Sequence, residues 1–198
     1  LVGSALAYRG IPLQSAYCGA KHAVQGFLDS IRPELEHRGS KVHVTMVQLP
    51  AVNTPQFDWA RAHIRHKPRP VGKIYQPEVA ARAIRFAAHA RRKEVWVGYT
   101  TVQAIRGDQL ASPLLDEYLA ETGVTGQASA EPIEPDRKDN LFEPVPGDPG
   151  AHGRFDDKAV GTSWQMWLNR NRRTLAASAA GAIAAGGLGW LARKAARG

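Results

Sequence analysis

The chain has 198 residues, a net charge of +8 and 43% hydrophobic residues, which is enough apolar content for a folded core. Its single cysteine excludes an internal disulfide, and its Cys and His residues show no metal-ligand spacing, so a reducing, cytoplasmic compartment is expected. The charge lies in blocks: residues 1–104 carry 15 Lys and Arg against 6 Asp and Glu, residues 105–150 carry 3 against 10, and residues 151–198 carry 8 against 2. No platform of aromatic and basic residues accompanies this charge, so we expect no nucleic-acid partner.

Predicted strands and helices alternate in the first half of the chain. Residues 1–4 have the character of a strand that ends in a small polar residue. Apolar residues recur with helical spacing over residues 17–37, where Pro33 is expected to kink or locally break the helix. The β-branched residues of 41–49, which end at a proline, predict a strand buried in a parallel sheet.

A long excursion over residues 50–76 follows. It contains several prolines, and its apolar residues show no regular spacing, which predicts a loop with one short helix. Pro77 and Glu78 suit the first turn of the next helix, and residues 94–98 resemble another short strand. Strands and helices in this order predict an α/β fold with a parallel sheet, in which ligands bind beyond the carboxyl ends of the strands.

The excursion is strongly basic. Its charged residues include Arg61, Arg65 and Lys67, which either meet an acidic substrate or a membrane surface or are simply solvated. The solvated alternative is the more common one for such a run of charges.

The second half of the chain changes character. We expect residues 105–162 to form an acidic, Pro-rich linker and irregular segment, since five of the thirteen prolines lie between Pro132 and Pro149. Residues 163–198 are predicted to be a basic, Ala/Gly-rich tail helix. Within this tail, residues 174–192 are nineteen residues without charge, about the length of a membrane-crossing helix, although Ala and Gly contribute little hydrophobicity. A membrane-spanning or membrane-associated helix, a helix that packs on a partner, and a flexible tail remain as alternatives.

Three residues near the N-terminus could perform acid-base chemistry. Tyr17 and Lys21 are four residues apart at the start of the first helix, so their side chains project from one face. An ammonium so placed stabilises a phenolate, and such a tyrosine can exchange a proton with a substrate oxygen. Ser4, thirteen residues earlier, could bind the same oxygen. The Tyr-x-x-x-Lys spacing alone is weak, because a solvated helix pair has the same pattern.

In context these residues resemble the short-chain dehydrogenase/reductase family. That family has a serine at the end of its fifth strand and Tyr-x-x-x-Lys about thirteen residues later, as Ser4 and Tyr17 to Lys21 are placed here. After its sixth strand the family has Pro-Gly and then, three residues past the glycine, a threonine. Here Pro50 is followed by Ala51 in place of the glycine, and then by Val52, Asn53 and Thr54.

The resemblance implies the C-terminal half of a Rossmann-like, doubly wound parallel sheet over residues 1–104. It also implies an NAD- or NADP-dependent oxidoreductase that transfers hydride to or from a small alcohol or carbonyl substrate. Tyr17 would be the catalytic acid/base, Lys21 would assist it and bind the nicotinamide ribose, and Ser4 would orient the substrate. Pro50, Ala51, Val52 and Thr54 would contact the nicotinamide, together with Tyr17 and Lys21, and the excursion would cover the substrate. The resemblance also allows a homo-oligomer.

The glycine-rich loop with which this family binds the dinucleotide is not found in the sequence. The glycines of the tail cannot replace it, since no predicted strand precedes them. We therefore expect that the dinucleotide-binding half lies outside these residues and that they have little activity alone. The alternative is a non-catalytic binding or membrane-surface module that retains half of the fold.

Overall fold

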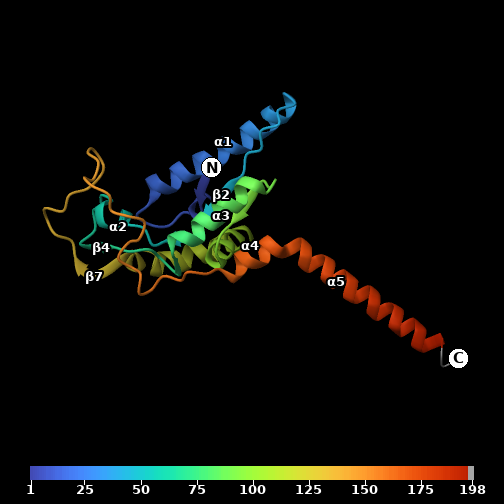
Figure 1. The fold of residues 1–198 in the computed structure, drawn as a ribbon. Coiled ribbons are helices and arrows are strands. Elements are labelled where there is room, and N and C mark those ends of the chain that lie inside the picture. The colour runs from blue at the N-terminus through green and yellow to red at the C-terminus, as the bar shows by residue number, and fades with distance from the viewer. Residues whose placement is uncertain (196–198) are drawn as a thin grey trace. The chain divides into compact units, whose positions relative to one another are not determined.

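The structure is a computed structural model that describes residues 1–195, without the side chains of residues 188, 189 and 191–195. The chain divides into two units, residues 1–163 and residues 164–198. The first unit combines helices with short strands, and the described part of the second is one helix (Figure 1). The last three residues of the tail predicted over 163–198 lie outside the described residues.

Three parallel strands form the main sheet. They are β1 (Val2–Ser4), β2 (Met46–Leu49) and β6 (Glu94–Trp96), with β2 in the middle. The α/β class and the partial Rossmann-like sheet predicted from the sequence are confirmed. The strand expected over residues 41–49 is paired only from Met46, because the neighbouring strands reach no further toward its start.

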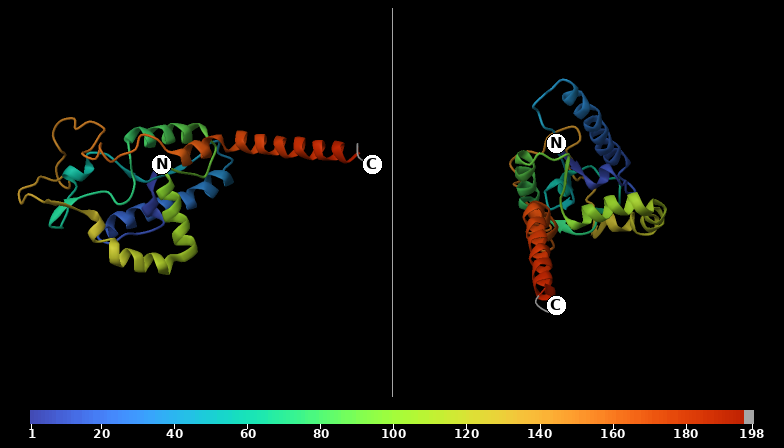
Figure 2. Two further views of the ribbon diagram at one scale, coloured as in Figure 1. Left: turned by 90° about the horizontal axis from the view of Figure 1, so that it is seen from below. Right: turned by 90° about the vertical axis from the view of Figure 1, so that its right-hand side faces the viewer.

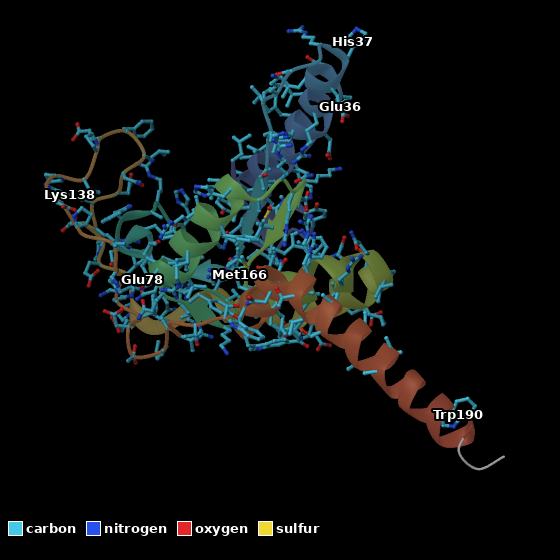
Figure 3. The ribbon with its side chains drawn as sticks, turned by 45° about the vertical axis from the view of Figure 1, so that its right-hand side comes forward. Glu36, His37, Glu78, Lys138, Met166 and Trp190 are labelled. Atoms are coloured by element: carbon cyan, nitrogen blue, oxygen red, sulfur yellow. The ribbon has the colours of Figure 1, made fainter. Side chains whose placement is uncertain are left out.

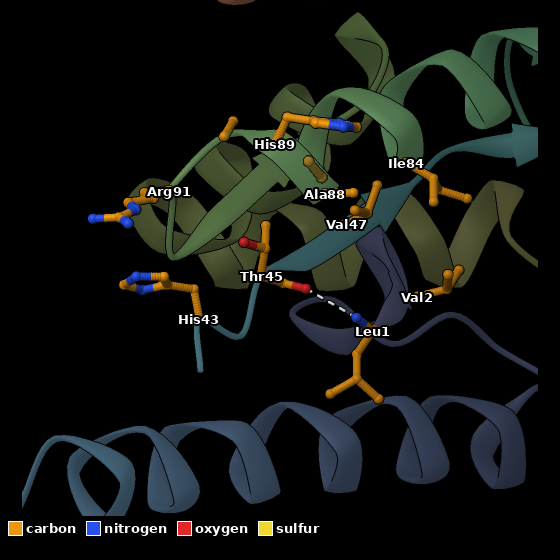
Figure 4. A pocket seen from close by; sticks show the side chains of 11 residues that line it. Leu1, Val2, His43, Thr45, Val47, Ile84, Ala88, His89 and Arg91 are labelled. Atoms are coloured by element: carbon orange, nitrogen blue, oxygen red, sulfur yellow. Dashed lines mark hydrogen bonds between the residues drawn. The ribbon is translucent and has the colours of Figure 1, made fainter. Parts of the chain in front are cut away.

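Two helices lie on opposite faces of this sheet, as Figures 2 and 4 show: α1 (Ser15–His37) and α3 (Pro77–His89). Helix α1 continues through Pro33 without a break and ends at His37. Gly39, two residues later, has a φ of +63°, the left-handed conformation that often follows a helix C-terminus. Helix α3 begins at Pro77, as predicted. The core between helices and sheet consists of apolar side chains, among them Leu28, Met46, Val47, Val79, Ala83, Ala87 and Val95.

The excursion after β2 contains more structure than a loop with one helix. It forms β3 (Ala51–Val52), the expected short helix α2 (Gln56–Trp59), β4 (His66–Pro68) and β5 (Ile74–Tyr75). Strand β3 pairs in parallel with β5, and β4 pairs with the antiparallel β7 (Ala128–Pro132). The excursion is thus held by a strand from the second half of the chain.

The segment after residue 104 differs from the irregular linker that we predicted. Helix α4 (Tyr99–Thr122) crosses residue 104, with a kink at Ala111 just before Pro113. Two short 3-10 helices, η1 (Ala5–Ala7) and η2 (Thr125–Gln127), lie elsewhere in this unit. Helix α4 packs on η1 and β7 pairs with β4, so the first part of this segment is not irregular. Residues 133–163, which contain most of the proline-rich stretch, form neither a helix nor a strand, apart from an isolated bridge at Val160, as expected.

The second unit is helix α5 (Trp164–Ala195), which confirms a helical tail. Within the part of the chain that the structure describes, none of the helices combines the length and the apolar character needed to cross a membrane. The membrane-spanning interpretation of residues 174–192 stays a prediction, since the side chains of residues 188, 189, 191 and 192 lie outside the described part of the chain. Trp190, labelled in Figure 3, is exposed on this helix.

Candidate active site at the carboxyl ends of the sheet

The two segments expected to carry the chemistry start at neighbouring strand ends. Ser4, the last residue of β1, is in register with Leu49, the last residue of β2. Pro50 follows directly. Because the strands are parallel, Ser4 and the segment from Pro50 to Thr54 begin at the same edge of the sheet, where α/β proteins bind their ligands.

Tyr17 and Lys21 lie together in the first turns of α1. The Nζ atom of Lys21 is 5.4 Å from the centre of the Tyr17 ring. The same ammonium donates a long hydrogen bond of 3.4 Å to the backbone oxygen of Val2, in β1. Tyr17 is 44% exposed, so part of this residue faces solvent. The structure thus brings the predicted tyrosine and lysine together beside the strand that ends at Ser4.

Ser4 is 92% buried at the junction of β1 and η1. Its Oγ accepts a hydrogen bond of 3.2 Å from the backbone N–H of Leu6 and so caps η1. Among the described residues, its hydrogen-bond partner is Leu6 rather than Tyr17. A hydroxyl that accepts one bond can still donate its own hydrogen, so this geometry leaves Ser4 able to bind a substrate oxygen.

A buried glutamine, which the sequence did not single out, anchors the segment before α1. The Nε2 atom of Gln127 donates to the backbone oxygens of Pro12, at 2.7 Å, and Gly123, at 2.6 Å. Its Oε1 accepts from Gln14, the residue that precedes α1, at 2.6 Å. Residues from beyond α4 therefore fix the position from which Tyr17 projects.

The predicted nicotinamide-contacting segment is a short, ordered turn. Ala51 and Val52 form β3 and are partly exposed, and the backbone N–H of Thr54 donates to the oxygen of Val52 at 2.9 Å. Ala51 stands where the family pattern has glycine.

Asn53 is the functional candidate that sequence reasoning missed in this segment. It is fully buried, although both of its neighbours are partly exposed. Its Nδ2 donates to Gln76 at 3.1 Å and to Asp156 at 2.8 Å, and its Oδ1 accepts from the backbone of Phe155 at 3.0 Å. The sequence held one indication of its role, an amide side chain shortly after a predicted strand. Its partners, 23 and about 100 residues away, were not predictable.

Two of the three basic side chains singled out in the excursion form ion pairs within the chain. Arg61 forms an ion pair of 2.7 Å with Asp139, and this hydrogen bond lowers the pKa of the Asp139 carboxyl. Lys67 lies 3.0 Å from Glu134 and 3.2 Å from Glu131. The acidic second half thus neutralises these two charges, while Arg65 is exposed.

A depression at the opposite end of the sheet is not the candidate site. Its lining includes Leu1, Thr45, Val47 and Ile84, at the amino ends of the strands (Figure 4). There the N-terminal ammonium of Leu1 donates to the oxygen of Thr45 at 2.9 Å. The acid-base residues lie at the other end of β1.

Comparisons with known proteins agree with this geometry. Residues 1–64, which include Ser4, Tyr17, Lys21 and Thr54, match the family model described as short chain dehydrogenase. The chain is 28% identical over 194 residues to an uncharacterized oxidoreductase, YxnA, of Bacillus subtilis strain 168, and the match covers 98% of this chain. The chain spans about half the length of this curated relative, 53% of it. No solved structure matches the chain. The resemblance predicted from the sequence is confirmed over residues 1–64, which are similar to the short chain dehydrogenase model.

Proposed function

We propose that this chain carries the catalytic side of an NAD- or NADP-dependent oxidoreductase that interconverts an alcohol and a carbonyl compound. The observation that carries the proposal is the pairing of Tyr17 and Lys21 beside β1, with the Lys21 ammonium 5.4 Å from the tyrosine ring. Two comparisons support this proposal: these residues match the family model, and the relative is described as an oxidoreductase.

In this proposal each site residue has one task. Tyr17 gives its phenolic proton to the carbonyl oxygen during reduction and takes a proton from the alcohol during oxidation. Lys21 stabilises the phenolate that is left, and Ser4 donates a hydrogen bond that holds the substrate oxygen in line. The exposure of Tyr17 and the unused donor of Ser4 suit these tasks.

The donor groups present fit the nicotinamide end of a dinucleotide. An ammonium has three N–H donors, and the long bond of Lys21 to Val2 leaves donors for a ribose hydroxyl. The partly exposed segment from Pro50 to Thr54 offers backbone and hydroxyl groups to a carboxamide. When bound, the nicotinamide supplies or accepts the hydride.

We propose also that residues 1–198 alone bind such a dinucleotide weakly. The chain spans only 53% of its relative, and within residues 1–195 no glycine-rich loop between a strand and a helix could cradle the pyrophosphate.

The experiment is a transfer assay with the enzyme at its natural length. Reduced NADH and NADPH, deuterated at the nicotinamide, are incubated with a panel of aldehydes and ketones, and the alcohols formed are analysed by mass spectrometry. Deuterium on the carbinol carbon of at least one alcohol is the expected result. A panel that shows no deuterium transfer with either dinucleotide would contradict the proposed function.

A further inference from the structure

A five-residue segment from the expected linker, residues 152–156, lies against the turn that follows β2. We call residues 152–156 the strap. The backbone N–H of Gly153 donates to the oxygen of Asn53 at 3.3 Å, and that of Phe155 donates to the Asn53 side chain at 3.0 Å. The carboxylate of Asp156 accepts from the same side chain at 2.8 Å. One buried residue of the turn therefore holds the strap at three points.

Gly153 shows how closely the strap approaches Thr54. A Cβ atom at this position would lie 2.5 Å from the backbone oxygen of Thr54 and 2.8 Å from its carbonyl carbon. Backbone atoms cannot yield as the end of a flexible side chain can. The strap thus covers the backbone of Thr54 directly, and a glycine is needed for this contact.

The rest of the strap holds the excursion that follows. Arg154 forms an ion pair of 2.6 Å with Asp58 of α2 and donates to the backbone oxygen of Pro68 at 2.7 Å. The ring of Phe155 is buried and meets Phe57 edge to face, with ring centres 5.7 Å apart. The strap therefore fixes the start of the excursion as well as the turn before it.

The far end of the excursion is tied to the same region of the chain. His152 lies 2.8 Å from Glu78, at the start of α3, and 2.9 Å from Asp156 (Figure 3 labels Glu78). The side chain of Gln76 donates to Asp156 at 2.9 Å, and its backbone N–H donates to the oxygen of Val160 at 3.0 Å. Residues 152–160 thus hold the excursion over residues 50–76 near its start, at Asn53, and at its end, at Gln76.

We propose that the strap is a positioning element of the nicotinamide side of the site, in which Asn53 and Asp156 are positioning residues that act through Val52 and Thr54. This inference rests on the proposed function. Neither residue needs to touch the dinucleotide. Their hydrogen bonds fix the backbone on both sides of Asn53, and this backbone presents its neighbours to the nicotinamide.

The test separates the nicotinamide from the rest of the dinucleotide. Dissociation constants are measured on the enzyme at its natural length for NADH or NADPH and for the same molecule without nicotinamide, ADP-ribose or its phosphorylated form. The Asn53→Asp variant sets two carboxylates against each other, and the Asp156→Ala variant removes the acceptor of the Asn53 amide, so each single variant loses this hydrogen bond. In each, the reduced dinucleotide should bind about tenfold more weakly, which corresponds to the loss of one well-placed hydrogen bond, while ADP-ribose changes less than about twofold.

The double variant Asn53→Asp/Asp156→Asn exchanges donor and acceptor and restores the match. It should regain most of the lost affinity for the reduced dinucleotide. The matched control is Asp157→Asn, which removes the same charge one residue further along, at an exposed position, and should leave both dissociation constants unchanged.

Two failures can be distinguished. If the single variants keep the ratio of the two dissociation constants, whether or not their stability falls, the strap has only a structural role and the proposal is overturned. If the unmodified enzyme binds neither NADH nor NADPH, the proposed function itself is overturned, and the inference with it.

Discussion

Substitution of Gly153 by alanine should loosen the strap selectively. The new methyl group would lie 2.5 Å from the oxygen of Thr54 and 2.9 Å from Oδ1 of Asn53, so the strap or the turn must shift. Forced overpacking of this kind costs typically about 1–3 kcal/mol. If the cost falls on local opening, backbone amides of the strap should exchange with solvent about 5–150-fold faster, since this is the factor to which 1–3 kcal/mol corresponds.

The assay is hydrogen–deuterium exchange followed by mass spectrometry, with peptides that cover residues 150–160. Gly161→Ala is a matched control, because a Cβ atom at Gly161 meets no other atom within 4 Å. Equal exchange of these peptides in the two variants would refute the close contact between Gly153 and Thr54.

Two further predictions concern the supports of the site. Gln127→Ala leaves the two backbone carbonyls that Gln127 bonds without their partner, so the free energy of unfolding should fall by about 1–3 kcal/mol, measured by urea denaturation; an unchanged midpoint would contradict the anchoring role. The hydrogen bonds of His152 to Asp156 and Glu78 raise its pKa. The stabilisation of the strap by protonated His152 is therefore complete below about pH 6.5 and is lost as the pH rises through the raised pKa. The bond with His152 also lowers the pKa of Asp156, so that part is lost at the acid end, as the pH falls through the lowered value. The backbone amides of the strap should therefore exchange most slowly in mildly acidic solution, once the rates are corrected for intrinsic exchange. The His152→Gln variant should lack the increase in exchange rate on the alkaline side. A pH profile unaffected by this substitution would argue against a role of His152 in holding the strap.

Local patterns in the sequence predicted the elements whose formation depends on neighbouring residues. The helical spacing of α1 placed Tyr17 and Lys21 on one face, and the structure has them together. The β-branched run before Pro50 located the end of β2 correctly. It overestimated the strand's length, because a strand extends only as far as a partner pairs with it.

Contacts between distant residues could not be predicted in this way. Asn53 and Asp156 are 103 residues apart, and Arg61 and Asp139 are 78 apart. No periodicity relates such positions. Prolines and acidic residues suggested an unpacked linker, yet these acidic residues form ion pairs with the basic excursion, which is a tertiary effect that composition does not reveal.

The α4 helix shows a related limit. Its kink at Ala111 and the proline two residues later interrupt the apolar period that a sequence pattern requires. The charged side chain of Arg9 joins the two parts of this helix, through Asp108 before the kink and Asp116 after it. Long-range ion pairs of this kind stabilise a helix that the pattern of its own residues does not predict.

The most direct test of the central claim is the Tyr17→Phe variant of the enzyme at its natural length. The measurement is the rate of reduction of a carbonyl compound found in the transfer assay, with the dissociation constant of the reduced dinucleotide measured beside it. Loss of the proton donor should slow reduction at least about 100-fold, while the dissociation constant changes little. A variant that reduces the substrate as fast as the unmodified enzyme would show that Tyr17 is not the acid, and would contradict the account.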